Sequence, residues 1–473
     1  MPLENFVEPF RLAAENVDRV AMNVSWTVFV LLVSLAFRSL AQSDSLSHSH
    51  ESYGVIDTIL ISGNEKTKDY IILDEMTLKP GSEATPEAIE FDRNRIYSLG
   101  LFTRVDISYG ISEGQRLLRV DVSERWYLIP VPIFGFRDGD PKRPYYGGGL
   151  LHNNFRGRNQ KLLGLIVFGH NPSLALSFFD PLIDDNHDLY FDTGLSFSKI
   201  RNKSIVQSTL AGDYDELHYN LSATIGKRFS LYQWAGITLG YQIVEVTDPY
   251  PWRTTAADGI DRFLYGGISY RFDSRDLREY PSEGRFLSVY VTKSGFGESS
   301  ISYTRFGTDF RTYIPLPLSL TFAGRVHGTI VSGGRLPTYG HVFFGYGERI
   351  RGYFTTVFEG ENMVGTTVEL RYPLVKAFDI HVTEVPLPPE FSVWRFGISV
   401  AIFADAGLVW CRSSTDECPE PAIRADKIQF SSFFSGYGAG IRFLLPYGVV
   451  VRTEYAYNEY FEGQFILDFR ATL

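Results

Sequence analysis

The residues whose types and spacing could do chemistry are one arginine and two carboxylates. Arg351 stands in the segment IRGY at 350–353, Glu369 in VELRYP and Asp405 in FADAG. A guanidinium carries five donors in a fixed fork, so one arginine can bridge two carboxylates at once. The glycine that follows Arg351 permits a close approach that a side chain would forbid. These residue types favour ion pairing that fastens a segment in place, rather than bond cleavage.

Several enzyme motifs are missing from the chain. It has no H-E-x-x-H, P-loop or C-x-x-C motif. His327 has no assignable nucleophile, and we interpret it as an ordinary polar residue. His48 and His50 lie in a polar, aperiodic segment and are interpreted as solvated residues rather than metal ligands. We therefore expect no catalytic residue, no metal, no cofactor and no enzymatic activity.

The composition excludes several classes of protein. The 473 residues include 45 Lys and Arg against 55 Asp and Glu, and a net charge of −10 argues against a nucleic-acid partner. Aromatic residues at 15%, with 43 Gly and only 4 Met, favour β-structure. Two cysteines cannot form a disulfide scaffold or a four-thiolate zinc site. Cys411 and Cys418, in CRSSTDEC, are expected to form a loop disulfide if the protein is exported.

The N-terminal region predicts export. The apolar run at 26–37 is 12 residues long, which is too short for a membrane-spanning helix, and the small-residue pattern SLA follows it. We interpret residues 1–41 as a signal peptide cleaved after Ala41, with a start at Met22 left open. Residues 42–52 are predicted to be a linker.

Residues 53–127 have mixed periodicity that predicts a small α+β domain. Thr85 can cap a helix that Pro86 begins, and Gly100 can end it. The predicted order is β-α-α-β-β, with strands near 55–61, 105–109 and 117–122 and helices near 68–76 and 85–99.

From Leu128 to the C-terminus, apolar and polar residues alternate in segment after segment. Alternation alone also fits a soluble sandwich with its apolar face inward. Many long strands, polar faces of small and charged residues, and Tyr and Trp near strand ends favour the inverse arrangement, with apolar side chains facing lipid. Because backbone groups in lipid must be paired internally, the sheet must close. We predict sixteen strands that begin near residues 128, 144, 160, 172, 188, 216, 233, 263, 285, 301, 317, 363, 394, 436, 448 and 463.

The chain resembles the BamA/TamA superfamily of outer-membrane proteins. The segments SGNEKT, LKPG and RNRIYSLGLFTRVDIS make 53–127 similar to its POTRA module, a periplasmic unit that binds polypeptides. Ile350, Arg351, Gly352 and Tyr353 match the family's (V/I)RG(F/Y) motif, and FADAG resembles its F-x-D-x-G pattern. The family usually ends in an aromatic residue, whereas this chain ends in Leu473, so Phe469 is the candidate to serve instead.

The resemblance implies a fold: one POTRA domain at 53–127 and a sixteen-stranded transmembrane antiparallel barrel at 128–473, with a loop near 332–362 inserted in the lumen. In that lumen we expect Arg351 to pair with Glu369 and Asp405; the alternative is that the three are ordinary pore-lining charges. Glycines at three positions would support the loop and its wall: Gly345, Gly347 and Gly407. The barrel seam would join the strand of Val131 to that of Phe469, and the prolines that flank Val131 would weaken it, since proline donates no ladder hydrogen bond.

The resemblance also implies a location and a function. The protein would lie in the outer membrane of a Gram-negative bacterium, with its POTRA domain in the periplasm. There it would assemble and insert β-barrel proteins by strand augmentation. Its partners would be unfolded outer-membrane polypeptides, the lipid bilayer and periplasmic or lipoprotein accessory subunits. Two alternatives stay open: a two-partner-type channel for polypeptide secretion, and a passive pore or surface protein.

Overall fold

The structure is a computed structural model, and it describes residues 52–112, 114–136, 142–184, 187–278, 280–296, 300–381, 393–412, 434–446 and 449–471. The predicted signal peptide and the linker before Ser52 lie outside these residues.

The N-terminal domain has the predicted α+β order. Its sheet has the strand order β2-β5-β4, in which β2 and β5 run parallel and β4 and β5 antiparallel. As predicted, Thr85 caps the longer helix, since its Oγ1 accepts a hydrogen bond from Ala88 N at 3.2 Å. The elements are β1 (Gly54–Val55), β2 (Thr58–Ser62), α2 (Asp69–Leu73), β3 (Glu83–Ala84), α3 (Pro86–Tyr97), β4 (Phe102–Ser112) and β5 (Gln115–Glu124). The short β1–β3 pair was not predicted, and α2 ends three residues earlier than predicted.

A buried carboxylate holds the chain between α2 and α3. Asp92 on α3 accepts hydrogen bonds from Thr77 N at 2.8 Å, Thr77 Oγ1 at 2.7 Å and Leu78 N at 2.9 Å. Its burial raises the pKa of the Asp92 carboxyl above the ordinary value. The residue therefore fixes the path of the backbone after α2.

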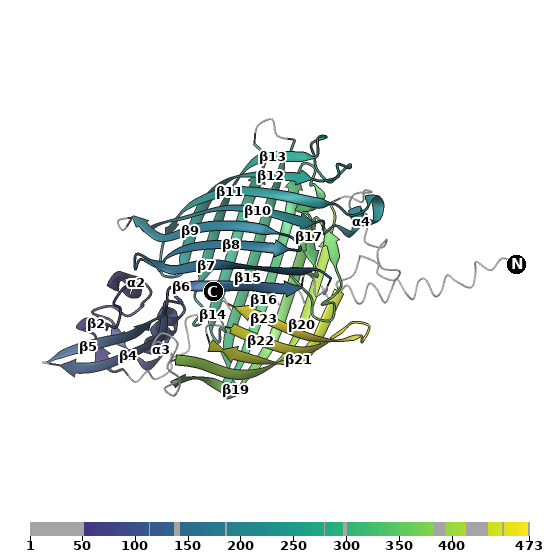
Figure 1. Cartoon of the computed structure of the whole chain (residues 1–473). Helices are drawn as coiled ribbons and strands as arrows, with labels where there is room; N and C mark the ends of the chain where they lie inside the picture. The colour runs from purple at the N-terminus through teal and green to yellow at the C-terminus, as the bar shows by residue number, and fades with distance from the viewer. Residues whose placement is uncertain are drawn as a thin grey trace. The chain divides into compact units, whose positions relative to one another are not determined.

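The main element of the rest of the described chain is an antiparallel sheet of sixteen strands, which Figure 1 shows side by side. Every strand begins within three residues of its predicted start. The strands are β6 (Leu128–Phe136), β7 (Pro144–Phe155), β8 (Gln160–Gly169), β9 (Ser173–Asp184), β10 (Leu189–Arg201), β11 (Asp215–Arg228), β12 (Gln233–Val246), β13 (Ile260–Asp273), β14 (Gly284–Ser294), β15 (Tyr303–Leu316), β16 (Leu320–Gly333), β19 (Asn362–His381), β20 (Val393–Trp410), β21 (Phe434–Leu445), β22 (Val449–Asn458) and β23 (Gly463–Ala471).

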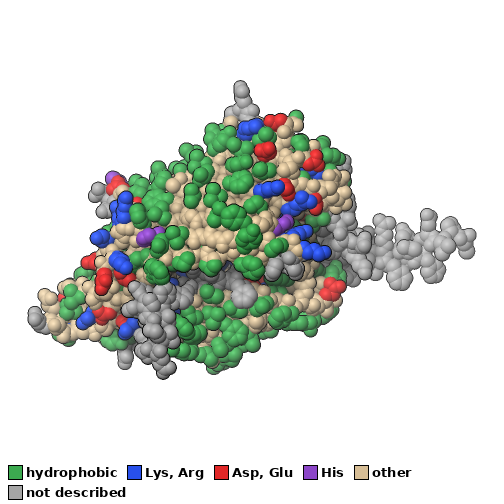
Figure 2. Space-filling model, viewed as in Figure 1, with side chains coloured by type: hydrophobic (Ala, Val, Ile, Leu, Met, Phe, Trp, Pro, Cys, Tyr) green, Lys and Arg blue, Asp and Glu red, His purple; other side chains and the backbone are tan. Residues whose placement is uncertain are grey.

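The sheet carries its apolar side chains outward, as predicted. Exposed large side chains follow the alternation along each strand, for example Leu195, Leu221, Leu239 and Ile268, each at least half exposed. Figure 2 shows hydrophobic side chains spread over this outer wall, with charged side chains toward the ends of the strands. The opposite face carries polar residues such as Glu369 and Asp405, which are buried. This polarity is that of a barrel wall between lipid and a polar lumen.

The two end strands of the sheet are β6 and β23. Val131 on β6 lies opposite Gly149 on β7, and Phe469 on β23 lies opposite Val451 on β22. Within the described residues, no ladder of paired residues joins β6 to β23. This is the place where the sequence predicts the seam.

The connections contain more than the predicted strands, including the short 3-10 helices η3 (Pro317–Ser319) and η4 (Thr338–Gly340) and two further features. The helix α4 (Ile205–Ala211) follows β10, and Ser204 caps it by accepting a hydrogen bond from Gln207 N at 3.2 Å. Between β16 and β19, the short strands β17 (Val342–Phe344) and β18 (Phe358–Gly360) form a hairpin. Both features are too short to leave a periodic pattern. No helix among the described residues combines the length and apolar character needed to cross a membrane.

Candidate functional site

The segment between β17 and β18 carries the IRGY motif, and glycines allow its backbone to lie against the wall. Gly352 has φ of +99°, and a Cβ there would lie 2.7 Å from the carbonyl oxygen of Tyr457 on β22. On the wall side, a Cβ at Gly436 on β21 would lie 1.5 Å from the carbonyl oxygen of Arg351. The loop backbone therefore packs directly on β21 and β22, so closely that neither glycine position has room for a side chain.

Arg351 contacts both carboxylates that the sequence singled out. Its Nε and Nη2 donate to Asp405 Oδ2 at 2.7 Å and Oδ1 at 2.6 Å, and its backbone N–H donates to Oδ2 at 3.0 Å. Its Nη1 donates to Glu369 Oε1 at 2.9 Å. The guanidinium also lies 3.5 Å from the centre of the Phe403 ring. The arginine side chain is only 8% exposed, so solvent screens these ion pairs weakly.

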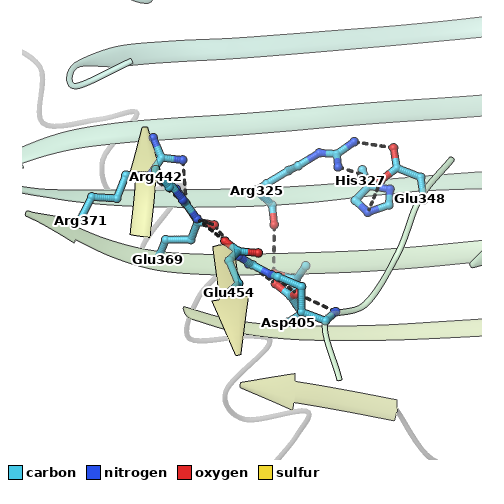
Figure 3. A network of polar contacts seen from close by, with 10 residues as sticks. Arg325, His327, Glu348, Glu369, Arg371, Asp405, Arg442 and Glu454 are labelled. Carbon is cyan, nitrogen blue, oxygen red and sulfur yellow. Dashed lines mark hydrogen bonds and ion pairs between the residues drawn. The ribbon is translucent and has the colours of Figure 1, made fainter. Parts of the chain in front are cut away.

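Three further charged residues, which the sequence analysis missed, complete this network (Figure 3). Glu454 on β22 accepts from Arg351 Nη1 at 3.2 Å. Arg442 on β21 donates to Glu369 at 2.6 and 2.8 Å and to Glu454 at 3.1 Å, and Arg371 on β19 donates to Glu369 at 2.8 Å. Three carboxylates thus face three guanidiniums, so the buried network is formally neutral. We name it the anchor network: Arg351, Glu369, Arg371, Asp405, Arg442 and Glu454.

A second ion pair holds the same loop to a different part of the wall. Glu348, three residues before Arg351, accepts from Arg325 Nη1 and Nη2 on β16 at 2.8 Å each. Arg325 also donates to Asp309 on β15, at 2.9 Å from Nη2. His327, interpreted as a polar lumen residue, is buried with its Nε2 3.6 Å from Glu348. The polarity is reversed here, because the loop supplies the carboxylate and the wall supplies the cation.

The other motif residues make apolar and backbone contacts. Tyr353 is buried, and its ring packs edge-on against the rings of Phe358 and Phe434. Ile350 is buried, and a Cβ at Gly407 would lie 3.0 Å from its Cδ1. After the motif, Phe354 N donates to Gln464 Oε1 at 2.9 Å, which links the loop to the last strand, β23.

The three glycines expected to support the loop differ in their surroundings. Gly345 has φ of +109°, and a Cβ there would lie 2.4 Å from the carbonyl oxygen of Thr356, so this turn needs glycine. Gly407 lies against Ile350, as described above. A Cβ at Gly347 would meet no atom within 4 Å, so nothing packed against this position requires glycine.

Some predictions lie outside what the structure describes. Cys418 is not among the described residues, and the Cys411–Cys418 disulfide stays a prediction. Within the described residues, no three His, Cys, Asp or Glu side chains are grouped so that they could hold a metal ion.

Comparisons with known proteins identify the family and the fold. A family profile described as the Omp85 superfamily domain matches residues 154–464, and a POTRA profile, described as a surface antigen variable number repeat, matches residues 54–125. The chain is 21% identical over 306 residues to the outer membrane protein assembly factor BamA of Nitratidesulfovibrio vulgaris, and 29% identical over 192 residues to that of Neorickettsia risticii. These alignments cover 63% and 37% of this chain but only 37% and 25% of the relatives, so the chain spans well under half the length of either.

Two solved structures share the fold. One is the crystal structure of BamA from Haemophilus ducreyi lacking POTRA domains 1–3, with a TM-score of 0.52 and 16% identity over 88% of this chain and 83% of that one. The other is CdiB from Escherichia coli, with a TM-score of 0.52 and 12% identity over 88% of this chain and 74% of that one. At such identities the likeness establishes the architecture alone.

Proposed function

This chain belongs to the Omp85 superfamily and is an outer-membrane protein with a periplasmic POTRA domain, and on that premise we propose that it assembles and inserts β-barrel proteins into the outer membrane. Its substrates would be unfolded outer-membrane polypeptides, taken up strand by strand. The process needs no bond-making chemistry from the protein, because the product differs from the substrate only in its conformation.

The observation that carries this proposal is the pair of end strands. Among the described residues, β6 and β23 are not joined by a ladder, so each is an edge at which backbone N–H and C=O groups can pair with another strand. Pro130 and Pro132 lie on β6 and cannot donate to such a ladder, which weakens any direct pairing of the two edges. An incoming strand would add its own hydrogen bonds to one edge, which is β-augmentation.

The inserted loop would keep the rest of the wall in register while the seam opens. The anchor network joins the loop to β19, β20, β21 and β22, and the Phe354–Gln464 bond reaches β23. The Glu348–Arg325 pair fastens the same loop to β16. We infer that the loop braces the strands next to the seam, so that movement is confined to the β6–β23 edges.

Seam crosslinking tests the proposal. The double variant Val131→Cys/Phe469→Cys, joined by a bifunctional thiol crosslinker, should block insertion of an urea-unfolded barrel protein into vesicles that contain the purified protein. A matched control is Val451→Cys/Phe469→Cys, which joins β23 to its existing neighbour β22 and should leave insertion unchanged. Insertion at the normal rate through a crosslinked seam would contradict the mechanism.

A second candidate is secretion of a polypeptide through the lumen. A cavity of about 770 Å³ lies beside the loop and is lined by anchor-network residues and by Arg325 and Asp468, so polar space is present next to the loop. Secretion would require the loop to release its anchors, whereas insertion at the seam would not. Crosslinking the loop to the wall therefore separates the two functions, since it should stop only secretion. Periplasmic or lipoprotein accessory subunits fit either function.

A further inference from the structure

The lipid-facing wall has a hollow near the first strands. Its volume is about 610 Å³, and it spans β6 to β11 on the wall that faces the viewer in Figure 2. Apolar side chains and small residues form most of its lining, which includes Leu128, Leu150, Gly164, Leu176, Thr193 and Leu195, together with His152 on β7. The anchor network and the loop play no part in it.

The strand register explains why the hollow exists. Across the strands, Leu150 lies opposite Gly164, Gly164 opposite Leu176, and Leu176 opposite Leu195. The three leucines are each about half exposed and stand out from the wall, while the glycine between them leaves a gap. A Cβ at Gly164 would meet only one atom, a methyl of Leu176 at 3.4 Å, so the position is open to the outside.

The neighbouring row of residues extends the gap along the wall. Leu162 lies opposite Phe178, and Phe178 opposite Thr193. The Thr193 hydroxyl donates to the carbonyl oxygen of Ser222 at 2.8 Å, so its hydrogen-bonding capacity as a donor is used within the sheet. The small threonine therefore widens the hollow without adding an unpaired donor to it.

The position along the strands places the hollow in the periplasmic half of the wall. The POTRA domain leads directly into β6, so the start of β6 is its periplasmic end. Leu128 at that end lies opposite His152, near the end of β7, and β8 begins after the short turn that follows. Gly164 is four residues from the start of β8, or roughly 13 Å along the strand, against a hydrocarbon core of roughly 30 Å.

We propose that this hollow is a binding site for one acyl chain of a phospholipid from the periplasmic leaflet. A flat wall touches a lipid chain on one side only, whereas a groove surrounds it, and each added contact gains dispersion energy. The occupant follows from the surroundings: the hollow is continuous with the lipid-facing surface, and its lining contains no Lys, Arg, Asp or Glu to bind a polar ligand, with His152 as its one titratable side chain. Packing of this kind drives association within a membrane, where the hydrophobic effect between apolar surfaces is absent.

The test is lipid retention by the full-length protein purified in detergent, counted by native mass spectrometry. The wild-type protein should retain one phospholipid, and Gly164→Leu, which fills the gap, should lower retention about tenfold, as expected from the loss of roughly ten dispersion contacts with the acyl chain. The matched control is Gly148→Leu, on the neighbouring strand β7, where a Cβ would meet nothing closer than a backbone oxygen at 3.8 Å and which does not line the hollow. This variant should retain lipid as the wild type does.

Equal retention by wild type and Gly164→Leu would overturn the proposal, as would a wild-type protein that holds no lipid. If Gly164→Leu fails to fold, Thr193→Leu fills the same hollow from the other row and carries the same expectation. Delipidated protein should regain the bound molecule from phospholipid. Recovery only from lipopolysaccharide would contradict the assignment to the periplasmic leaflet.

Discussion

Removal of the Arg351 side chain is the perturbation with the largest expected effect on the barrel. Arg351→Ala deletes four side-chain hydrogen bonds to carboxylates, three of them at 2.9 Å or less. Asp405, only 1% exposed, would lose its one ion-pair partner among the described residues, whereas Glu369 and Glu454 would keep Arg442. Removing one partner of a buried ion pair costs about 3–5 kcal/mol, because the remaining charge is left buried without compensation.

The assay is thermal unfolding of the purified barrel, followed by its change in mobility on gels, together with protease cleavage of the loop. A loss of 3 kcal/mol or more should lower the unfolding temperature by at least roughly 5 °C and expose the loop to protease. Arg349→Ala is the matched control. Arg349 lies two residues away, makes no ion pair with a described residue, bonds through Nε to the Tyr346 carbonyl oxygen and stacks 4.1 Å from the centre of the Phe354 ring, so its removal should cost about 1–2 kcal/mol.

The proposed anchoring role predicts an order of effects as well as a size. Arg351→Lys keeps the charge but loses the fork that reaches two carboxylates, so its unfolding temperature should lie between those of wild type and Arg351→Ala. Equal stability and equal protease resistance of Arg351→Ala and Arg349→Ala would refute the reasoning, because it would mean that the network does not hold the loop.

Three other expectations follow from the contacts. A double-mutant cycle of Glu348→Ala and Arg325→Ala, scored by loop proteolysis, should give a coupling of about 1 kcal/mol, and strict additivity would show that this pair does not hold the loop. Gly436→Ala should displace the loop and cost about 1–3 kcal/mol in thermal unfolding, whereas Gly347→Ala, in open space, should change little; equal effects would contradict the close packing. Asp92→Ala should leave two backbone N–H groups unpaired and destabilise the POTRA domain by about 2–3 kcal/mol. The loss should be visible as faster hydrogen exchange in α3 of the full chain, and unchanged exchange would refute this expectation.

Much of the fold could be predicted because its signals are local. Alternation of apolar and polar residues marks each strand, and turn residues mark its ends, so all sixteen strand starts were predicted to within three residues. Capping by Thr85 and the proline after it marked α3 in the same way. The helix α4 was missed because seven residues are too few for helical periodicity, although its cap, Ser204, is the residue type that caps prefer.

The candidate site could be predicted only in part, because its contacts depend on register. Arg351, Glu369 and Asp405 stand in recognisable motifs. Arg442 and Glu454 do not, and alternation says only that they face the lumen, as many polar residues do. Their contact with Glu369 depends on the antiparallel pairing of β19 with β20, β20 with β21 and β21 with β22, which brings residues far apart in sequence to the same level of the wall. The Glu348–Arg325 ion pair was not predicted because nothing in the local sequence around Glu348 indicates that Arg325 lies next to it.

The central claim is that this protein assembles other barrel proteins, and depletion in its native cell tests it most directly. The measurement is the abundance of each protein in the isolated outer membrane, by quantitative mass spectrometry, as the protein is depleted. The proposed function predicts that many different β-barrel proteins fall together, while lipoproteins of the same membrane stay at their normal level. Loss of a single secreted polypeptide, with barrel proteins unchanged, would contradict it.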